Sequence, residues 1–427
     1  TGTTTTLAAV TLATTATGIG TSAGTSTGTD GLTDTDRPHP TTSAHVGPTS
    51  LGPTFVVPAS AVKDEAMNLE ELRRQLSAVD RKLVELIAER QQIVGKIGRS
   101  KQGTGTGTRD YAREKDVLDM GRVQAVEAGV DPDLVENLLQ LLIRTSLESQ
   151  ERDRVIAEGK GDGRTALVIG GGGKMGRWFA EFFASQGFAT TIADPSVENG
   201  PNRYRNWTDA GVDYDVIAVA APLAVSGRIL AQLAVLKPRG LIFDIGSLKS
   251  PLLDGIAELR AAGCRVTSLH PMYGPDTRLL SGRHLIFCDA GDAQATADAK
   301  ELFAATMVEQ LDMGLEDHDR LIAYVLGLSH ALNIEFFTAL AESGEAAPKL
   351  AKMSSTTFDS QLLVSEAVAQ DNPRLYFEIQ NLNRFGLGPL DALCDAARRI
   401  RETVADGDES AFVELMEKGR DYLAMRG

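Results

Sequence analysis

Cysteine is scarce in this sequence of 427 residues. The three cysteines, Cys264, Cys288 and Cys394, are widely separated and odd in number. This pattern fits neither a zinc site nor a disulfide framework, so no metal centre is expected. A chain without a disulfide framework belongs by default to a reducing compartment, and we expect the protein to be cytoplasmic.

Dense basic runs and long apolar runs are also missing. The formal net charge is −15, and an acidic chain without a basic patch is not expected to bind nucleic acid. No apolar run approaches the length of a membrane span, so no membrane insertion is expected. The apolar share of 42% and the charged share of 24% are ordinary for a globular protein. The length allows two or three domains.

Residues 1–66 lack any hydrophobic periodicity. They consist of a tract rich in Thr, Gly, Ala and Ser, followed by Pro-rich sequence up to Pro58. Such a segment cannot bury enough apolar surface to offset its ordering entropy, so we expect a disordered leader. No charged residue precedes Asp30, and the segment therefore resembles neither a secretory signal nor an Arg-rich transit peptide.

Helical periodicity extends over residues 67–155, and residues 156–164 have the Gly-rich composition of a linker. Asp131 followed by Pro132 is typical of a helix start, with an N-cap and a proline in the first turn. The repeated glycines of 103–108 are expected to separate the two preceding helices. The expected helices are Leu69 to about Lys101, about Asp110 to Ala128, and a third that starts at Asp131.

Short apolar runs alternate with helical segments in residues 165–315. This alternation predicts a parallel, doubly wound sheet of the Rossmann type. Residues 316–427 are expected to be all-helical and to open with one long helix. The expected strands are Thr165–Gly170, Ala189–Asp194, Asp215–Pro222, Gly240–Ser247 and Arg265–Pro271.

A glycine-rich turn follows the first expected strand. Its spacing is G-x-G-x-x-G, and it opens a helix whose N-terminus can hold a pyrophosphate. Asp194 ends the second strand, 18 residues after Gly176. A carboxylate there can bind the ribose hydroxyls and repel a 2′-phosphate, so NAD rather than NADP is expected. The expected cofactor-binding residues are Gly171, Gly173, Lys174, Met175, Gly176 and Asp194.

His270 lies in "SLHPMYGPD", at the end of the fifth expected strand. Doubly wound folds bind their ligands at this edge of the sheet. A histidine beside a nicotinamide can take the proton of a substrate hydroxyl while hydride leaves the same carbon. A structural role is the alternative for a single histidine, but the neighbouring nucleotide site favours catalysis.

These motifs resemble prephenate dehydrogenase. The resemblance rests on "VIGGGGKMGR", "SLHPMYGPD", "EDHD" and the helical C-terminal region, over about residues 165–385. It implies that His270 bonds the ring hydroxyl of prephenate, and that the ring carboxylate leaves as carbon dioxide. It also implies that Lys249 lies near the substrate, with a surface lysine at a helix start as the alternative. His330 matches a residue linked to tyrosine inhibition in bacterial relatives, with a structural role as the alternative.

Two positions depart from the family pattern. Ala220 stands where members have a serine that helps to place the histidine and the substrate. Glu366 stands about where members have an arginine for the ring carboxylate, and Arg374 or Arg384 could substitute for it. Arogenate and the 4-amino analogue of prephenate therefore stay open as substrates.

Two cations fall on the apolar face of the first expected helix. Arg90 and Lys101 share the stripe of Leu83, Leu86 and Ile97. Because they are eleven residues apart, they differ by only about 20° in angle and lie roughly 16 Å apart along the axis. They either extend to the rim of a core or bind an anion inside the helix packing.

The helical region resembles the all-helical chorismate mutases, through "LRRQLSAVD", "AERQQIVGKIGRSK", "RDYAREKD" and "RTSLESQ". Chorismate rearranges to prephenate without a covalent intermediate. The resemblance implies that Arg90 and Lys101 stabilise charge on the ether oxygen and that Glu114 orients the ring. The implied site residues are Arg73, Arg90, Lys101, Asp110, Arg113, Glu114, Ser146 and Gln150.

Arg73 cannot share a site with Lys101 of the same chain. The two are 28 residues apart, which is about 42 Å along a straight helix. We therefore expect Arg73 to enter the site of a partner subunit in an intertwined homodimer.

The two resemblances together predict a bifunctional enzyme of tyrosine biosynthesis, of the T-protein type. The mutase makes the prephenate that the dehydrogenase oxidises with NAD, and tyrosine is a candidate feedback inhibitor. One alternative is the same chemistry on 4-amino-4-deoxychorismate. Another is that the first helical region serves only for dimerisation or sensing. A third is an unrelated dehydrogenase of the β-hydroxyacid type.

Overall fold

The computed structural model describes residues 69–101 and 109–426. The expected leader and the glycine-rich segment 103–108 lie outside these described residues. From Glu70 onward the described residues belong to one unit of mutually contacting elements.

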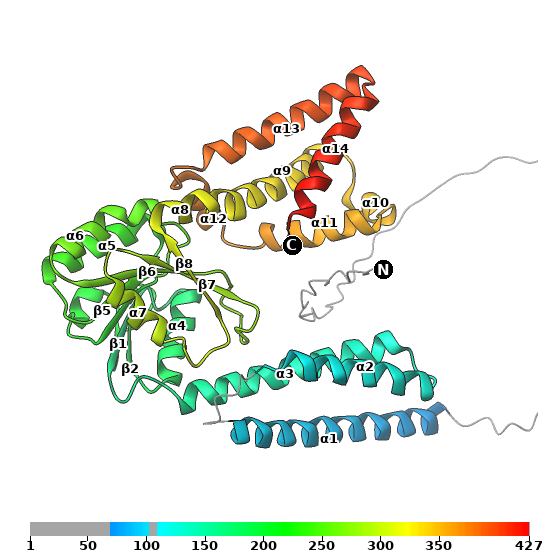
Figure 1. Ribbon diagram of the computed structural model, residues 1–427, viewed down its shortest axis with the longest axis horizontal. Helices are drawn as coiled ribbons and strands as arrows, with labels where there is room; N and C mark the ends of the chain where they lie inside the picture. Colours follow the sequence, from blue (N-terminus) through cyan, green and yellow to red (C-terminus); the bar gives the residue numbers. More distant parts are fainter. Residues whose placement is uncertain (1–68, 102–108, 427) are drawn as a thin grey trace, which may run out of the picture. The chain divides into compact units, whose positions relative to one another are not determined.

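Three helices form the N-terminal part of the described chain (Figure 1). They are α1 (Leu69–Lys101), α2 (Tyr111–Glu127) and α3 (Pro132–Ala157). Asp110 caps α2 by accepting a hydrogen bond from the backbone N–H of Arg113, and Asp131 caps α3 in the same way from Asp133. These side chains satisfy N–H groups that have no partner within their own helix. The three expected helices are thus confirmed.

The apolar stripe of α1 is exposed in the single chain. Leu83, Leu86 and Ile97 retain 46%, 52% and 46% of their accessible surface. Leu134 and Leu141 of α3 retain 61% and 59%. Exposed large apolar side chains along one helix stripe are typical of a face that another protein surface covers.

The central part of the chain is an eight-stranded sheet with the strand order β3-β2-β1-β4-β5-β6-β7-β8. All neighbouring strands are parallel except β6 and β7, which are antiparallel. The five expected strands are confirmed, whereas β3, β7 and β8 were not predicted. The strands are β1 (Thr165–Ile169), β2 (Ala189–Ala193), β3 (Arg203–Tyr204), β4 (Val216–Val219), β5 (Leu241–Asp244), β6 (Arg265–Pro271), β7 (His284–Asp289) and β8 (Glu309–Gly314).

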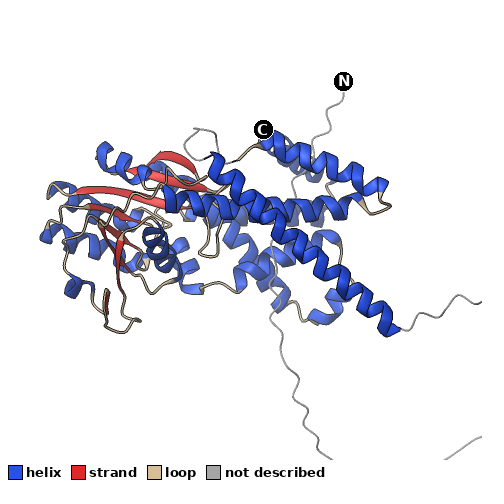
Figure 2. Cartoon of the chain, turned by 90° about the horizontal axis from the view of Figure 1, so that it is seen from below, coloured by secondary structure: helices blue, strands red, loops and turns tan. Residues whose placement is uncertain are grey.

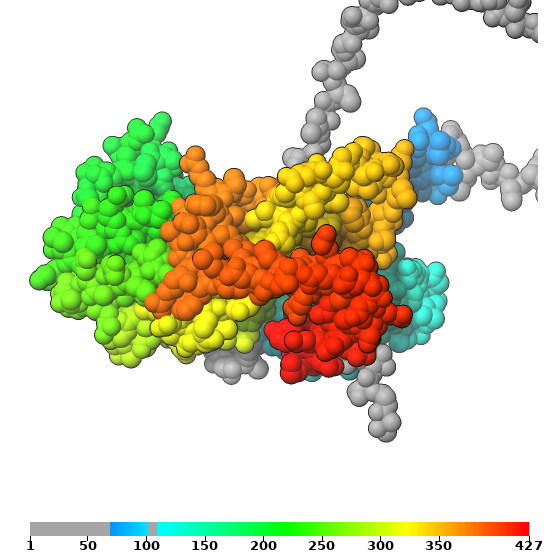
Figure 3. Space-filling model, turned by 90° about the horizontal axis from the view of Figure 1, so that it is seen from above, coloured from blue at the N-terminus to red at the C-terminus, as the bar shows by residue number. Residues whose placement is uncertain are grey.

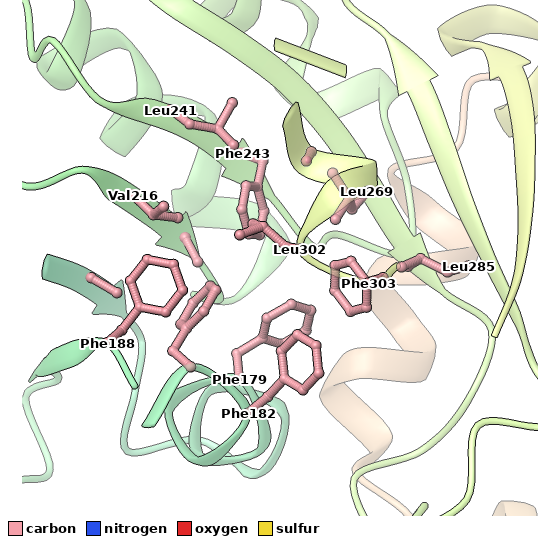
Figure 4. Packing of buried hydrophobic residues seen from close by; sticks show 14 of the residues in the cluster. Phe179, Phe182, Phe188, Val216, Leu241, Phe243, Leu269, Leu285, Leu302 and Phe303 are labelled. Carbon is pink, nitrogen blue, oxygen red and sulfur yellow. The ribbon is translucent and has the colours of Figure 1, made fainter. Parts of the chain in front are cut away.

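Helices flank both faces of this sheet (Figure 2). On one face, α4 (Lys174–Ser185) contributes Phe179, Phe182 and Phe183 to a core that also contains Phe243 and Phe303 (Figure 4). On the other face, Leu230 and Leu233 of α5 pack with Ile217 and Ile242. The remaining elements of this region are η1 (Trp207–Ala210), α5 (Leu223–Leu236), η2 (Ser250–Leu252), α6 (Leu253–Ala261) and α7 (Ala293–Glu301).

The C-terminal part is all-helical, as expected, and its last helices α13 and α14 are seen from outside in Figure 3. Several of its large apolar side chains are exposed, among them Tyr324, Phe377 and Val404 at 53%, 66% and 65%. Its elements are α8 (Leu315–Ile322), η3 (Ala323–Leu328), α9 (Ser329–Glu342), α10 (Ala347–Lys352), α11 (Thr356–Ala369), α12 (Pro373–Asn381), α13 (Leu387–Asp406) and α14 (Glu409–Ala424).

One helix contradicts the expectation that no apolar run approaches the length of a membrane span. The segments α8, η3 and α9 form a continuous helix, Leu315–Glu342, of 28 residues. Its most apolar window has a mean hydropathy of 1.3, so its length and composition would suffice to cross a membrane. The central helix of a globular helical domain has the same properties, and a long apolar helix beside other exposed apolar surface also suits a subunit interface.

Candidate active sites

The glycine-rich turn between β1 and α4 leaves no room for side chains at two of its positions. A Cβ on Gly176 would lie 2.1 Å from the carbonyl oxygen of Gly170, and one on Gly172 would lie 2.5 Å from Ser196 Oγ. Gly173 caps α4 without a side-chain hydrogen bond. The first N–H groups of α4 therefore stay available to an anion, as a dinucleotide pyrophosphate requires.

Asp194 lies beside this turn, directly after β2. Its Oδ1 accepts hydrogen bonds from the backbone N–H and the hydroxyl of Ser196, at 2.8 and 2.6 Å. A Cβ on Gly172 would lie 2.7 Å from the Asp194 carboxyl carbon. The carboxylate is thus held in place beside the glycine-rich turn by Ser196. The side chain of Lys174 is exposed at the start of α4, and Met175 packs against the core.

Replacing Asp194 with alanine should raise the KM for NAD about 10-fold or more and narrow the preference for NAD over NADP. In the expected role of Asp194, the change removes both the acceptor for the ribose hydroxyls and the charge that repels a 2′-phosphate. Loss of one hydrogen bond to a charged group costs about 1.5–3 kcal/mol. Steady-state kinetics with both dinucleotides measure the effect. Glu198→Ala, an exposed change in the same loop, is the matched control, and an equal effect of the two changes would contradict the assignment.

His270 lies in β6 and belongs to a buried hydrogen-bonded chain. Its Nδ1 is 2.8 Å from Nε2 of His318, and Nδ1 of His318 is 2.8 Å from Oδ1 of Asp319. Burial lowers the pKa of His270 well below its usual 6.5, and the positive charge of Lys249, together with that of His318 whenever it is protonated, acts in the same direction. The imidazole is therefore neutral at physiological pH, which is the form that can accept a proton.

Lys249 is a buried structural cation. Its ammonium donates to Asp244 Oδ1 at 2.8 Å, to the Gly246 carbonyl at 2.8 Å and to the Leu269 carbonyl at 2.7 Å. Its side chain is 0% exposed, so the expected alternative of a surface lysine is wrong. An ammonium has three N–H donors, and all three are used within the protein. Lys249 therefore has none left for a substrate in this conformation.

Ala220 and Glu366, the two residues that depart from the family pattern, are less buried than His270 and His318. Ala220 is half-buried just beyond β4, and Glu366 on α11 is exposed and accepts a hydrogen bond from Gln370 at 2.9 Å. Arg384 is paired with Glu316 at 2.9 Å. Arg374 is exposed at the start of α12. Arg374 and Arg384 are therefore the two candidate cations for a ring carboxylate.

Arg90 points into the contact between α1 and α3. Its Nη1 donates to the Ser146 hydroxyl at 2.6 Å and to the Leu142 carbonyl at 3.1 Å. Burial lowers the pKa of Arg90, but an arginine stays protonated in proteins. Gln150, one turn after Ser146, donates to the Val94 carbonyl at 3.4 Å. Three of the expected site residues, Arg90, Ser146 and Gln150, thus meet at one helix contact.

The other expected residues of this site are arranged differently. Asp110 caps α2, while Arg73 and Arg113 are exposed. The side chain of Lys101 lies outside the part of the structure that is described. Both carboxylate oxygens of Glu114 accept hydrogen bonds from Arg109, each at 2.9 Å. Arg109 was not predicted as a partner of Glu114, although it directly precedes Asp110 in "RDYAREKD".

Also overlooked was the chain from His318 to Asp319 behind His270. The sequence signal for it was "EDHD", a histidine flanked by carboxylates. The local sequence could not show that α8 would bring this histidine against the end of β6, since the two histidines are 48 residues apart.

Three family models match separate parts of the chain. Residues 72–151 match chorismate mutase type II. Residues 202–310 match the nucleotide-binding domain of prephenate dehydrogenase, and residues 315–418 match its dimerization domain.

Several known proteins are similar to the larger part of the chain. A T-protein of Enterobacter agglomerans is 28% identical, over 83% of this chain and 93% of its own. A 4-amino-4-deoxyprephenate dehydrogenase of Streptomyces pristinaespiralis is 26% identical, over 61% of this chain and 92% of its own. The fold is also similar to a crystal structure of A. aeolicus prephenate dehydrogenase, with a TM-score of 0.51 and 17% identity. That match covers 63% of this chain and 100% of the other.

Proposed function

The chain belongs to the family of bifunctional chorismate mutase/prephenate dehydrogenases, and on this premise we propose how its own residues carry out the two steps. The first step rearranges chorismate to prephenate. The second oxidises prephenate with NAD and releases carbon dioxide, giving 4-hydroxyphenylpyruvate. The observation that carries the first step is the half-buried Arg90 at the contact of α1 and α3. The buried His270 at the edge of a dinucleotide-binding sheet carries the second.

In the mutase step, Arg90 is proposed to hold the substrate and to stabilise negative charge on its ether oxygen. Ser146 and the Leu142 carbonyl hold the guanidinium in place before substrate binds. Fixed donors aimed at developing charge lower the barrier because they need no reorganisation during the reaction. Lys101, Arg113 and Gln150 are proposed to bind the carboxylates, and Glu114 to orient the ring.

In the dehydrogenase step, His270 is proposed to accept the proton of the ring hydroxyl. Bound NAD supplies the acceptor for the hydride that leaves the same carbon. The ring carboxylate then departs as carbon dioxide, because its bonding electrons complete the aromatic ring. The dinucleotide would be held by Gly171, Gly173 and the N-terminus of α4, with Asp194 at the ribose.

We propose a division of the chain that follows these two activities. The mutase domain covers residues 67–155, the dinucleotide-binding domain 165–315 and the helical dehydrogenase domain 316–427. Helix α3 continues to Ala157 and so overlaps the start of the proposed linker 156–164.

We propose a homodimer in which Arg73 completes the mutase site of the partner. Arg73 is exposed on α1, whose apolar stripe is also exposed. If the model holds, mixing inactive Arg73→Ala with inactive Lys101→Ala should restore mutase activity, toward a quarter of the wild-type rate per subunit. In a hybrid dimer one site has lost both residues and the other has retained both. Activity is measured after the subunits have exchanged, and proven exchange without recovery would contradict the shared site.

The 4-amino analogue of prephenate is the second candidate substrate. Glu366 and Ala220 depart from the family pattern, Lys249 has no free donor, and one similar protein is a 4-amino-4-deoxyprephenate dehydrogenase. Comparing kcat/KM for prephenate, arogenate and the amino analogue tests the choice. The proposal expects prephenate to have the highest value, and a higher value for the amino analogue would replace it.

We further propose a cytoplasmic enzyme that tyrosine inhibits. His330 is a candidate for this response, because its ring packs 4.2 Å from that of Tyr376 and its Nδ1 is buried without a hydrogen-bond partner among the described residues. Initial rates on prephenate with increasing tyrosine test the inhibition, and rates independent of tyrosine would contradict it.

A further inference from the structure

The hydrogen-bonded chain behind His270 indicates which ring nitrogen of His270 carries a proton. Four polar groups contact the two carboxylate oxygens of Asp319. Its Oδ1 accepts from the Lys249 backbone N–H at 2.7 Å and lies 2.8 Å from His318 Nδ1, and its Oδ2 accepts from the backbone N–H and hydroxyl of Ser250. His318 and Asp319 are 0% and 1% exposed.

These contacts keep Asp319 ionised. Burial by itself would raise the pKa of Asp319, but the hydrogen bonds from His318, Ser250 and Lys249 hold it below its ordinary value. An ionised carboxylate can only accept hydrogen bonds. The proton between the two groups therefore belongs to His318 Nδ1.

The tautomers of both histidines then follow. Burial lowers the pKa of His318 as well, so this ring is neutral and its Nε2 carries a lone pair. Since His318 Nε2 accepts, His270 Nδ1 must donate across the 2.8 Å that separate them. A neutral imidazole has one proton. Nε2 of His270 is consequently the nitrogen with the free lone pair.

We propose that His318 and Asp319 are positioning residues that hold His270 in the Nε2-basic tautomer, ready to accept the proton of the substrate hydroxyl. The inference rests on the proposed function and specifies how its base is prepared. When the substrate O–H bond breaks and the proton binds Nε2, His270 becomes an imidazolium. Its Nδ1–H still donates to His318, and the Asp319 carboxylate behind His318 stabilises the new positive charge. Asp244 meanwhile offsets the charge of Lys249, its hydrogen-bonded partner.

The test compares two amides at position 318. A glutamine amide extends to the place of the imidazole Nε2, so His318→Gln can still accept from His270 Nδ1. An asparagine amide reaches only the place of Nδ1, so His318→Asn keeps the contact with Asp319 and abandons His270. We expect kcat for prephenate oxidation to fall about 10²-fold or more in the asparagine variant, within the range known for lost acid–base assistance. The glutamine variant should recover at least 10-fold of that loss.

A double-mutant cycle separates positioning from structural support. If His318 acts only through His270, then His318→Asn should cause no further loss in a His270→Asn background, because groups that act as a unit are non-additive. The mutase rate of each variant serves as an internal control for folding, since its residues lie on other helices. Additive losses, or an asparagine variant as active as the glutamine variant, would overturn the proposal.

The same experiment distinguishes this inference from the proposed function. A low rate for His270→Asn together with a normal rate for His318→Asn would remove only the positioning role. A nearly normal rate for His270→Asn would remove the base itself, and with it the proposed dehydrogenase mechanism.

Discussion

The His270→Asn variant should oxidise prephenate about 10² to 10⁴ times more slowly than the wild type, because that is the usual value of a general base. Asparagine can still form a hydrogen bond, but it cannot take a proton. NAD binding should change little, since the dinucleotide is assigned to Gly171, Gly173, Gly176 and Asp194. Stopped-flow or steady-state kinetics give the rate, and titration of protein fluorescence with NAD gives the affinity.

The pH profile of the same pair of proteins gives a second readout. The neutral imidazole is the active form, so the wild-type rate falls when pH drops below the pKa of His270. Burial moves this pKa well below 6.5, with smaller contributions from His318 and Lys249; Asp319 and Asp244 are the nearby carboxylates. The acid limb should therefore lie below pH 6.5 and should vanish in the variant. His284→Asn, an exposed change on the neighbouring strand β7, is the matched control, and an unchanged acid limb in His270→Asn would assign the titration to another group.

The second large effect is expected in the other half of the chain. Arg90→Ala should cost the mutase about 3 kcal/mol or more of transition-state stabilisation, or more than about 10²-fold in kcat/KM. The guanidinium is held by Ser146 and the Leu142 carbonyl, and water cannot replace a fixed charge at the ether oxygen. The disappearance of chorismate measures this rate. Prephenate oxidation by the same variant should change less than about 2-fold, because mutations in separate sites usually act independently.

Arg81→Ala is the matched control for this variant. Arg81 lies nine residues before Arg90 on α1, about half a turn away around the axis, and its side chain is exposed. It should leave the mutase rate almost unchanged. If Arg81→Ala and Arg90→Ala had equal effects, or if Arg90→Ala lost both activities together, the loss would reflect damage to the helix rather than to a site.

Local sequence signals predict most elements of the fold. Asp131 with Pro132, the glycine spacing after Thr165–Ile169 and the apolar strand runs each depend on neighbouring residues alone, and the structure confirms the elements that they predict. Strands β3, β7 and β8 were not predicted, for a different reason in each case. The first has only two residues, β8 is a partly exposed edge strand, and β7 enters antiparallel after a loop rather than after a helix.

The sequence indicated which residues belong to the sites, but it did not show which other residues they contact. Sequence placed His270 at a strand end, yet the ring that fixes its tautomer lies 48 residues later. The sequence suggested a substrate or surface role for Lys249, whereas its ammonium is fully occupied in the core. A stripe such as Leu83, Leu86 and Ile97 shows which face of a helix avoids water, but not whether the same chain covers it. Contacts between distant residues or between subunits decide all three cases.

The product formed from chorismate tests most directly whether this single chain performs both steps. The purified protein is supplied with chorismate and NAD, and the organic products are identified by mass spectrometry while carbon dioxide and NADH are quantified. The account predicts 4-hydroxyphenylpyruvate, with one carbon dioxide and one NADH for each chorismate consumed. Prephenate that accumulates without NADH, or chorismate that persists while added prephenate is oxidised, would contradict the claim that this single chain performs both steps.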